Sequence, residues 1–305
     1  MRILRDPAQL SPCVLVLGTF DGVHRGHQEL LMRGDELAQA LGCALTVCTY
    51  EPHPLRVLRP EHAPKQLTTL AEKAALMATF GVDTLCVTSF TRERAAQPPE
   101  DYMAELVRVY QPHAVVCGYN FSFGQGGSGN GEALRTYGER HGFETVIVPE
   151  VQAEGATVSS TRIRQALQEG ALAQVTRLMG HPYTLTGCVA DGKHIGRTMG
   201  FPTANVAITK GKALPAFGVY ACWLETETAF YPAVVNVGRH PTLPEGHVTV
   251  EAHVLDEKLS LYGRRVRLTF LAFQRPERRF DSKEELQAQI DRDAEMCRAY
   301  FAGLQ

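Results

Sequence analysis

Residues 13–31 read CVLVLGTFDGVHRGHQELL, and this stretch decides the fold of the first half of the chain. Residues 14–17 form an apolar run of strand length that ends at Gly18. A short glycine-containing turn follows, and then Leu30 and Leu31 begin the apolar side of a helical pattern. A strand, a tight turn and a helix N-terminus bring backbone N–H groups and the positive end of the helix dipole to one place. The stretch therefore predicts an anion-binding site.

Two histidines mark this site. His24 and His27 are three residues apart, so in the first helical turn they share a face, where an imidazole can donate a hydrogen bond to a phosphate. Gly22 and Gly26 leave room for backbone or a nucleotide base to approach. The stretch is not a Walker A loop, because it lacks the Lys-Ser/Thr pair. The alternative is a pair of surface histidines in a loop, but the flanking strand and helix favour a binding turn.

Length and composition narrow the class of protein. The 305 residues suit one large or two medium domains, and the formal net charge of −2 gives no field that would favour nucleic acid or membrane as a partner. The eight cysteines include no C-x-x-C pair and read as reduced thiols. Neither a signal peptide nor a transmembrane run is present. We expect a cytoplasmic protein that binds no nucleic acid or membrane; its oligomeric state has no sequence signal.

The first part of the chain alternates strands and helices. Strands are predicted at 44–50, 84–87, 114–117 and 145–148, helices at 68–79 and 100–110, and a proline-rich loop at 51–60. Thr68 or Thr69 is the predicted N-cap of the first of these helices, with Glu72 near N3. This alternation predicts a doubly wound parallel sheet, an α/β fold with ligands outside the carboxyl ends of its strands.

The pattern changes near residue 182. Strand-like runs follow at 183–190, 219–224, 233–237, 248–255 and 266–273, and an amphipathic helix at 282–304 begins with a capping box of Ser282 and Glu285. This predicts a second, all-β domain, a small barrel with a terminal helix. The predicted domains are 1–182 and 183–305.

Two further stretches of the first domain contain residues suited to binding. Residues 118–131, GYNFSFGQGGSGNG, are rich in glycine and aromatics; the alternative is a mobile surface loop. Residues 158–167, VSSTRIRQAL, place hydroxyls, Arg162 and Arg164 at a helix start whose N-cap is Ser159 or Ser160. This helix start is a second candidate anion site, with a capped helix and solvated arginines as the alternative.

Together these motifs resemble those of prokaryotic bifunctional riboflavin kinase/FMN adenylyltransferases. The resemblance covers G-T-F-D-G-V-H-x-G-H, the N-F-x-F segment and S-S-T-x-I-R in the first domain. In the second domain it covers GRTMGFPTAN at 196–205 and Glu251 in VEAHVLD. It implies a nucleotidyltransferase-like first domain that adenylylates FMN to FAD, and a second domain that phosphorylates riboflavin with MgATP.

The resemblance also implies site residues. In the first domain, His24 and His27 would be catalytic, ATP would bind Gly18, Thr19, Phe20, Asp21, Gly26, Ser160, Thr161, Arg162 and Arg164, and FMN would bind Asn120, Phe121 and Phe123. In the second domain, ATP would bind Gly192, Gly196, Arg197, Gly200, Phe201, Pro202, Thr203 and Asn205, and Mg²⁺ would bind Thr203 and Asn205. Glu251 would be the base; on its strand alone it also reads as the polar face, and His253 on the same side reads as structural.

Two other interpretations stay open. Thr19, Asn120 and Ser122 differ from residues that are frequent in the family, so the chain could be a riboflavin kinase whose first domain has lost adenylyl transfer. A nucleotidyltransferase fused to a nucleic-acid-binding barrel is the second alternative. It is disfavoured because the barrel strands lack interleaved aromatic and basic residues.

Overall fold

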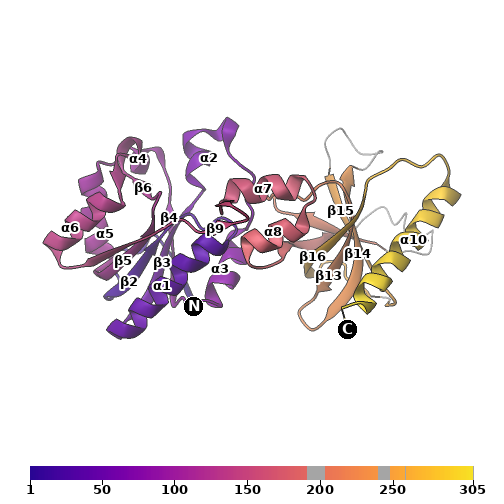
Figure 1. Ribbon diagram of the computed structural model, residues 1–305, viewed down its shortest axis with the longest axis horizontal. Coiled ribbons are helices and arrows are strands. Elements are labelled where there is room, and N and C mark those ends of the chain that lie inside the picture. Colours follow the sequence, from indigo (N-terminus) through magenta and orange to yellow (C-terminus); the bar gives the residue numbers. More distant parts are fainter. Residues whose placement is uncertain (191–202, 240–247, 258, 305) are drawn as a thin grey trace. The chain divides into compact units, whose positions relative to one another are not determined.

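The computed structural model describes residues 1–190, 203–239, 248–257 and 259–304 (Figure 1). The chain divides into two compact units, Met1–Ser160 and Thr161–Gln305. The first unit contains the strands β1 (Arg2–Arg5), β2 (Cys13–Leu17), β3 (Ala44–Glu51), β4 (Thr84–Ser89), β5 (Pro112–Gly118), β6 (Ser122–Phe123), β7 (Gly129–Asn130), β8 (Glu144–Val148), β9 (Gln152–Ala153) and β10 (Ala156–Thr157). Its helices are α1 (Arg25–Leu41), α2 (Pro54–Leu58), η1 (Pro60–His62), α3 (Leu70–Ala78), α4 (Arg92–Ala95), α5 (Pro99–Tyr110), η2 (Gln125–Gly127) and α6 (Gly131–His141).

Six strands of this unit form one parallel sheet in the order β1-β4-β3-β2-β5-β8. The predicted doubly wound sheet is therefore confirmed, and the direction of strand order reverses at β2, between β3 and β5. The edge strand β1 was not predicted. It is short and largely exposed, so it has no buried apolar run that would indicate a strand.

Alternating side chains of β2 pack against opposite layers of helices. Val14 and Val16 belong to a core cluster with residues of α1 and α3. Leu15 and Leu17 belong to a second cluster with residues of α5 and α6. Burial on both faces explains why this strand is a continuous apolar run in the sequence.

The loop predicted at 51–60 is wrong in part, because this stretch contains α2 and the start of η1. Pro54 occupies the first helical position, where a missing N–H costs nothing, and the His53 Nδ1 accepts a hydrogen bond from the Leu55 N–H at 3.2 Å. Pro54 and Pro60 in this stretch each start a short helix. The predicted cap of α3 is confirmed, with Thr69 and Glu72 forming both hydrogen bonds of a capping box.

The second unit is a barrel with helices outside it. Its elements are β11 (Tyr183–Ala190), β12 (Ala204–Ile208), β13 (Gly218–Glu225), β14 (Phe230–Arg239), β15 (Val248–Val254), β16 (Arg265–Pro276), α8 (Leu172–Met179) and α10 (Lys283–Ala302), with α7 (Ser160–Gln168) beginning at the unit boundary. The strands close in the order β11-β12-β15-β14-β13-β16 through antiparallel pairs. The predicted barrel and terminal helix are confirmed. Strand β12 was not predicted, because only five residues follow the GRTMGFPT motif before the strand ends.

Helix α10, at the yellow end of the chain in Figure 1, is fixed to the barrel by a buried ion pair and an aromatic contact. Asp293 accepts two hydrogen bonds from the Arg275 guanidinium of β16, at 2.8 and 2.6 Å. Phe301 packs against Trp223 with ring centroids 4.7 Å apart. At the start of α10, Ser282 caps the Glu285 N–H as predicted, but the Glu285 carboxylate accepts from Asp281.

Two general expectations can be compared with the structure. All eight cysteines are free thiols, and six of them are buried, whereas Cys188 is exposed and Cys43 half-buried. Over the described ranges, none of the helices combines the length and apolar character that crossing a membrane requires.

Candidate active sites

The turn between β2 and α1 lies where the sheet order reverses. β2 ends at Leu17, and α1 begins at Arg25 with His24 in an extended N-cap conformation. The first turn of α1 contains no acidic residue, so nothing there opposes the positive end of the helix dipole. The position and the polarity of this turn are those of an anion-binding site.

The two histidines of the turn stack on each other. The ring centroids of His24 and His27 are 3.7 Å apart and the ring planes differ by 19°. A side chain at Gly26 would come within 3.3 Å of the His24 ring, so the space at this glycine is used by a histidine. The Nδ1 of His27 is buried and has no hydrogen-bond partner. Burial, together with the nearby His24 and Lys73, lowers the pKa of His27 well below its usual value, so the imidazole is neutral.

Residues far along the chain hold this turn in a strained conformation. Phe20 and Val23 have positive φ values of 51° and 40° and are fully buried. Positive φ at such residues costs about 1–3 kcal/mol each, so the surrounding contacts must impose it. The buried Asp21 carboxylate accepts hydrogen bonds from the backbone N–H groups of Leu67 and Thr68, at 2.8 and 3.2 Å.

A buried lysine of α3 holds the same turn through a hydrogen bond. The Lys73 side chain on α3 donates to the Thr19 carbonyl at 2.6 Å and to the Thr49 hydroxyl at 3.3 Å. That hydroxyl in turn donates to the Thr19 carbonyl at 3.0 Å. Lys73 is only 7% exposed, and burial lowers its pKa to about 8, although Asp21 and Glu51 act in the opposite direction.

The second predicted anion motif contacts the first at Ser160. Ser160, at the start of α7, donates to the Asp21 carbonyl at 2.8 Å. Within α7, Thr161 is exposed, and Arg162 and Arg164 are half-buried. The helix begins at Ser160, which agrees with the predicted start at the paired serines.

The glycine-rich segment 118–131 contains regular structure, including the paired strands β6 and β7. β6 and β7 pair, so Phe123 lies opposite Gly129. Phe123 is buried and stacks on Tyr102 of α5, with centroids 4.7 Å apart, and Phe121 is 5.6 Å from Phe123. Asn120 is exposed. Phe123 therefore supports the position of Tyr102.

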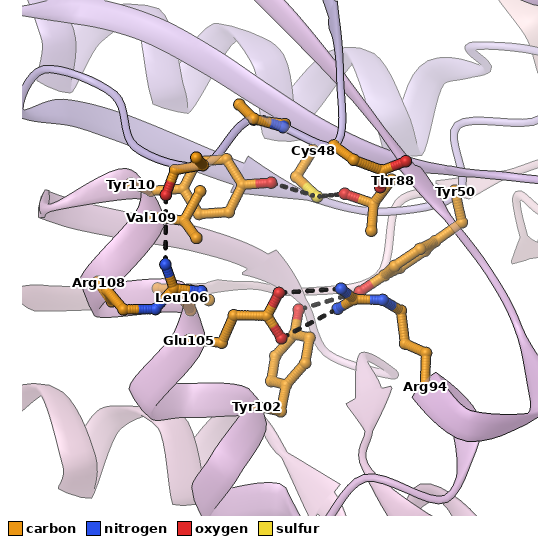
Figure 2. A pocket seen from close by; sticks show the side chains of 13 residues that line it. Cys48, Tyr50, Thr88, Arg94, Tyr102, Glu105, Leu106, Arg108, Val109 and Tyr110 are labelled. Atoms are coloured by element: carbon orange, nitrogen blue, oxygen red, sulfur yellow. Dashed lines mark hydrogen bonds and ion pairs between the residues drawn. The ribbon is translucent and has the colours of Figure 1, made fainter.

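Tyr102 lines a cavity of about 280 Å³ on the α5 side of the sheet (Figure 2). The Tyr50 hydroxyl donates to the Tyr102 hydroxyl at 3.2 Å. Arg94 pairs with both carboxylate oxygens of Glu105, at 3.3 and 2.9 Å, among the residues that line the cavity (Figure 2). Burial raises the pKa values of Tyr50 and Tyr102 above the usual range, so both phenols stay neutral. The cavity combines aromatic walls with polar and charged groups, Asp6, Thr88, Arg94, Glu105 and Arg108, that could orient a small molecule.

In the barrel, a row of polar residues crosses three adjacent strands. Glu251 on β15 is the register partner of Asn205 on β12 and of Asn236 on β14. Register partners in antiparallel strands point to the same face, so the three side chains share one outer face at one level. All three are half-buried, whereas Val250 and Ala252 beside Glu251 point into the barrel.

The remaining barrel residues are only partly described. Gly192, Gly196, Arg197, Gly200, Phe201 and Pro202 lie outside the described residues. Thr203 is half-buried next to the start of β12. In the described part of the chain, no three His, Cys, Asp or Glu side chains gather as they would to hold a metal ion by themselves. Neutral oxygens of Thr203 and Asn205 fit Mg²⁺, which usually takes few protein ligands and completes its shell with phosphates and water.

Several residues of these sites have no motif that marks them. Lys73, Tyr50 and Tyr102 read in the sequence as parts of a helix or strand, and Asn236 reads as one polar position in an alternating strand. In the sequence, the only hint that Lys73 has a special role is that a charged residue lies among the apolar residues of a capped helix. Their roles depend on contacts between distant segments.

Comparisons with known proteins indicate the same two-domain enzyme family over nearly the whole chain. A family model described as FAD synthetase matches residues 6–162, and one described as riboflavin kinase matches residues 179–301. A bifunctional riboflavin kinase/FMN adenylyltransferase of Escherichia coli K12 is 36% identical over 99% of this chain and 98% of its own length. A protein of the same name from Listeria monocytogenes is 35% identical over 96% of this chain and 93% of its own.

A solved structure from Streptococcus pneumoniae shares the complete fold. It has 30% sequence identity and a TM-score of 0.88, and the match covers 98% of this chain and 99% of that one. Its title describes a macrolide-efflux protein. The match therefore includes both the parallel-sheet unit and the barrel.

Proposed function

Because the chain belongs to the family of bifunctional riboflavin kinase/FMN adenylyltransferases, it is an enzyme with two activities, and we propose how its residues divide them. The barrel phosphorylates riboflavin with ATP to FMN, and the α/β part transfers AMP from ATP to FMN, giving FAD and pyrophosphate. We assign residues 1–182 to adenylyl transfer and 183–305 to the kinase. Free thiols throughout support a cytoplasmic location, and the partners that follow from the family are the small molecules ATP, riboflavin and FMN.

For adenylyl transfer, the ATP phosphates bind at the turn between β2 and α1. Attack by the FMN phosphate is in line at the α-phosphorus, so the protein contributes positioning and charge stabilisation. The neutral His27 contributes a hydrogen-bond donor and no charge. Positive charge has to come from the helix dipole and from cationic side chains, with Arg162 and Arg164 of α7 as candidates.

For the flavin, the cavity beside Tyr102 is the proposed site of the ring system. Tyr50 and Thr88, near the ends of β3 and β4, line it together with residues of α5, and β3 is the neighbour of β2 in the sheet. Phe123, which the sequence predicted to bind the flavin, does not line the cavity itself. It stacks on Tyr102 and so helps to hold that wall of the cavity in place. The expected effect of Tyr102→Ala is a higher KM for FMN with an unchanged KM for ATP, measured by steady-state FAD formation.

For the kinase, Glu251 is the proposed base for the riboflavin hydroxyl. A carboxylate within hydrogen-bond reach of the hydroxyl takes its proton as the phosphoryl group transfers. Asn205 and Asn236 flank Glu251 on both sides and orient the substrate phosphates or the carboxylate. Mg²⁺ on Thr203 and Asn205, when bound, neutralises charge on the ATP phosphates.

The assignment of the first site depends most on one observation, the stacked histidine pair at the N-terminus of α1. Purified protein with FMN and MgATP is expected to form FAD, identified by chromatography. Absence of FAD, with FMN still formed from riboflavin, would support the alternative of a kinase whose first domain is inactive. Thr19, Asn120 and Ser122 motivate that alternative.

A further inference from the structure

We propose that Lys73 is a positioning residue of the adenylyl-transfer site, where its ammonium group holds the Thr19 carbonyl and places a positive charge directly under the phosphate-binding turn. The inference rests on the proposed function of that turn.

The first argument is the geometry of the ammonium group. Lys73 reaches from α3 to a carbonyl in a different segment, at 2.6 Å, and shares that carbonyl with the Thr49 hydroxyl of β3. The carbonyl belongs to Thr19, the residue before the strained Phe20. Side chains from α3 and β3 therefore both donate to one carbonyl oxygen of the turn, and these two hydrogen bonds hold the start of the turn in place.

The second argument is the burial of a charge with few counter-charges. A lysine that is 7% exposed loses much of its hydration, which is costly unless the charge is used. The carboxylate Asp21 acts on it electrostatically but is itself hydrogen-bonded to the Leu67 and Thr68 backbone. No other lysine of the first unit is buried, since Lys65 is exposed.

The third argument is that the site needs a cation. The His27 imidazole is neutral, and ATP brings several negative charges to the N-terminus of α1. A fixed ammonium within a low-dielectric region stabilises charge on the phosphates without reorganising as the reaction proceeds. Lys73 contacts the turn that leads into α1, and its charge also acts on His27 of that helix.

The pH dependence follows from the groups that face Lys73. These are Asp21 in the turn, Glu51 at the end of β3, and His27 on α1; Glu51 is also paired with Arg5 at 2.8 Å. In the free enzyme the ammonium group loses its proton above about pH 8. Bound triphosphate favours the charged form, so the alkaline fall of kcat/KM for ATP lies at lower pH than the fall of kcat.

The test compares Lys73→Met, Lys73→Arg and Arg33→Met in the full chain. Arg33→Met removes one positive charge from an exposed position on α1 and is the matched control. FAD formation from FMN and ATP, FMN formation from riboflavin, and thermal unfolding are measured for each variant. Lys73→Met is expected to lower kcat/KM for ATP in FAD formation by about 10- to 100-fold and to lose the alkaline limb. Lys73→Arg is expected to move that limb to higher pH, while FMN formation stays unchanged in all variants.

The possible outcomes separate the two levels of inference. If the wild type forms no FAD from FMN and ATP, the proposed function of the turn and the role of Lys73 both fail. If the wild type forms FAD but Lys73→Met keeps its kcat/KM, or keeps the same alkaline limb, the role of Lys73 alone is overturned. If Lys73→Met does not fold, a wild-type kcat/KM that stays flat through pH 9 overturns the role equally.

Discussion

The two candidate sites handle the same reagent, ATP, in different ways. The site of the first unit depends on segments far apart in the sequence. Lys73 donates to Thr19, 54 residues earlier in the chain, and Ser160 donates to Asp21, 139 residues earlier. The described part of the barrel site depends on register, since Asn205, Glu251 and Asn236 are direct partners on adjacent strands. Side chains from α3 and the start of α7 hold the turn between β2 and α1, whereas strand pairing places the three barrel residues at one level.

The largest expected effect tests the independence of the two sites. His27→Ala removes a buried donor at the N-terminus of α1, so FAD formation from FMN is expected to fall by about 10²- to 10³-fold, as for other transition-state donors. FMN formation from riboflavin is expected to stay within about twofold, as measured by chromatography of both products. His62→Ala, at an exposed histidine, is the control and should change neither rate. Equal loss of both activities in His27→Ala would contradict two separate sites.

The reciprocal change is in the barrel. Glu251→Gln keeps the shape of the side chain and removes its basicity, so the riboflavin kinase rate is expected to fall by about 10²-fold or more. FAD formation from added FMN should not change. Glu227→Gln, at an exposed glutamate in the turn between β13 and β14, controls for the loss of charge. A kinase rate near that of the wild type would remove Glu251 from the role of base.

The buried charge of the first site should have a measurable cost in stability. Lys73 has a pKa of about 8 in the folded chain and 10.5 as the reference value, so the folded state binds fewer protons between these values. The free energy of unfolding of the wild type therefore rises with pH through this window relative to Lys73→Met. The variant is expected to be more stable at pH 7 by up to about 3 kcal/mol, a difference that shrinks towards pH 10.5. Urea unfolding at pH 7 and pH 10 measures it, and a less stable Lys73→Met at pH 7 would show that the lysine serves the fold.

The smallest effect is expected at a residue of the row that only register reveals. Asn236→Ala removes an amide at the level of Glu251, so the kinase rate is expected to fall by about tenfold, less than for the base itself. The effect should fall on kcat, because an amide beside the base positions the reacting groups but is not itself the proton acceptor. Unchanged kinetics in Asn236→Ala would limit the working row to Asn205 and Glu251.

Local patterns determined much of this protein from the sequence. The alternation of strands and helices, the cap at Thr69 and Glu72, the polarity change near residue 182 and the terminal helix all follow from periodicity and capping, which act within a few residues. The turn between β2 and α1 was predictable because its strand, glycines and helix N-terminus are contiguous. Two short elements were not, because β1 is four residues long and largely exposed, and β12 has only five residues in which to show an alternation.

Only the tertiary structure decided which distant residues complete each site. The contact of Lys73 with Thr19, the stacking of Phe123 on Tyr102 and the register of Asn236 with Glu251 join segments that no local pattern relates. Such contacts arise when helices pack on a sheet or strands close a barrel, and their geometry depends on packing and register across the whole unit. The residues that can bind phosphate are readable along the chain, but the groups that orient them become apparent only after the chain has folded.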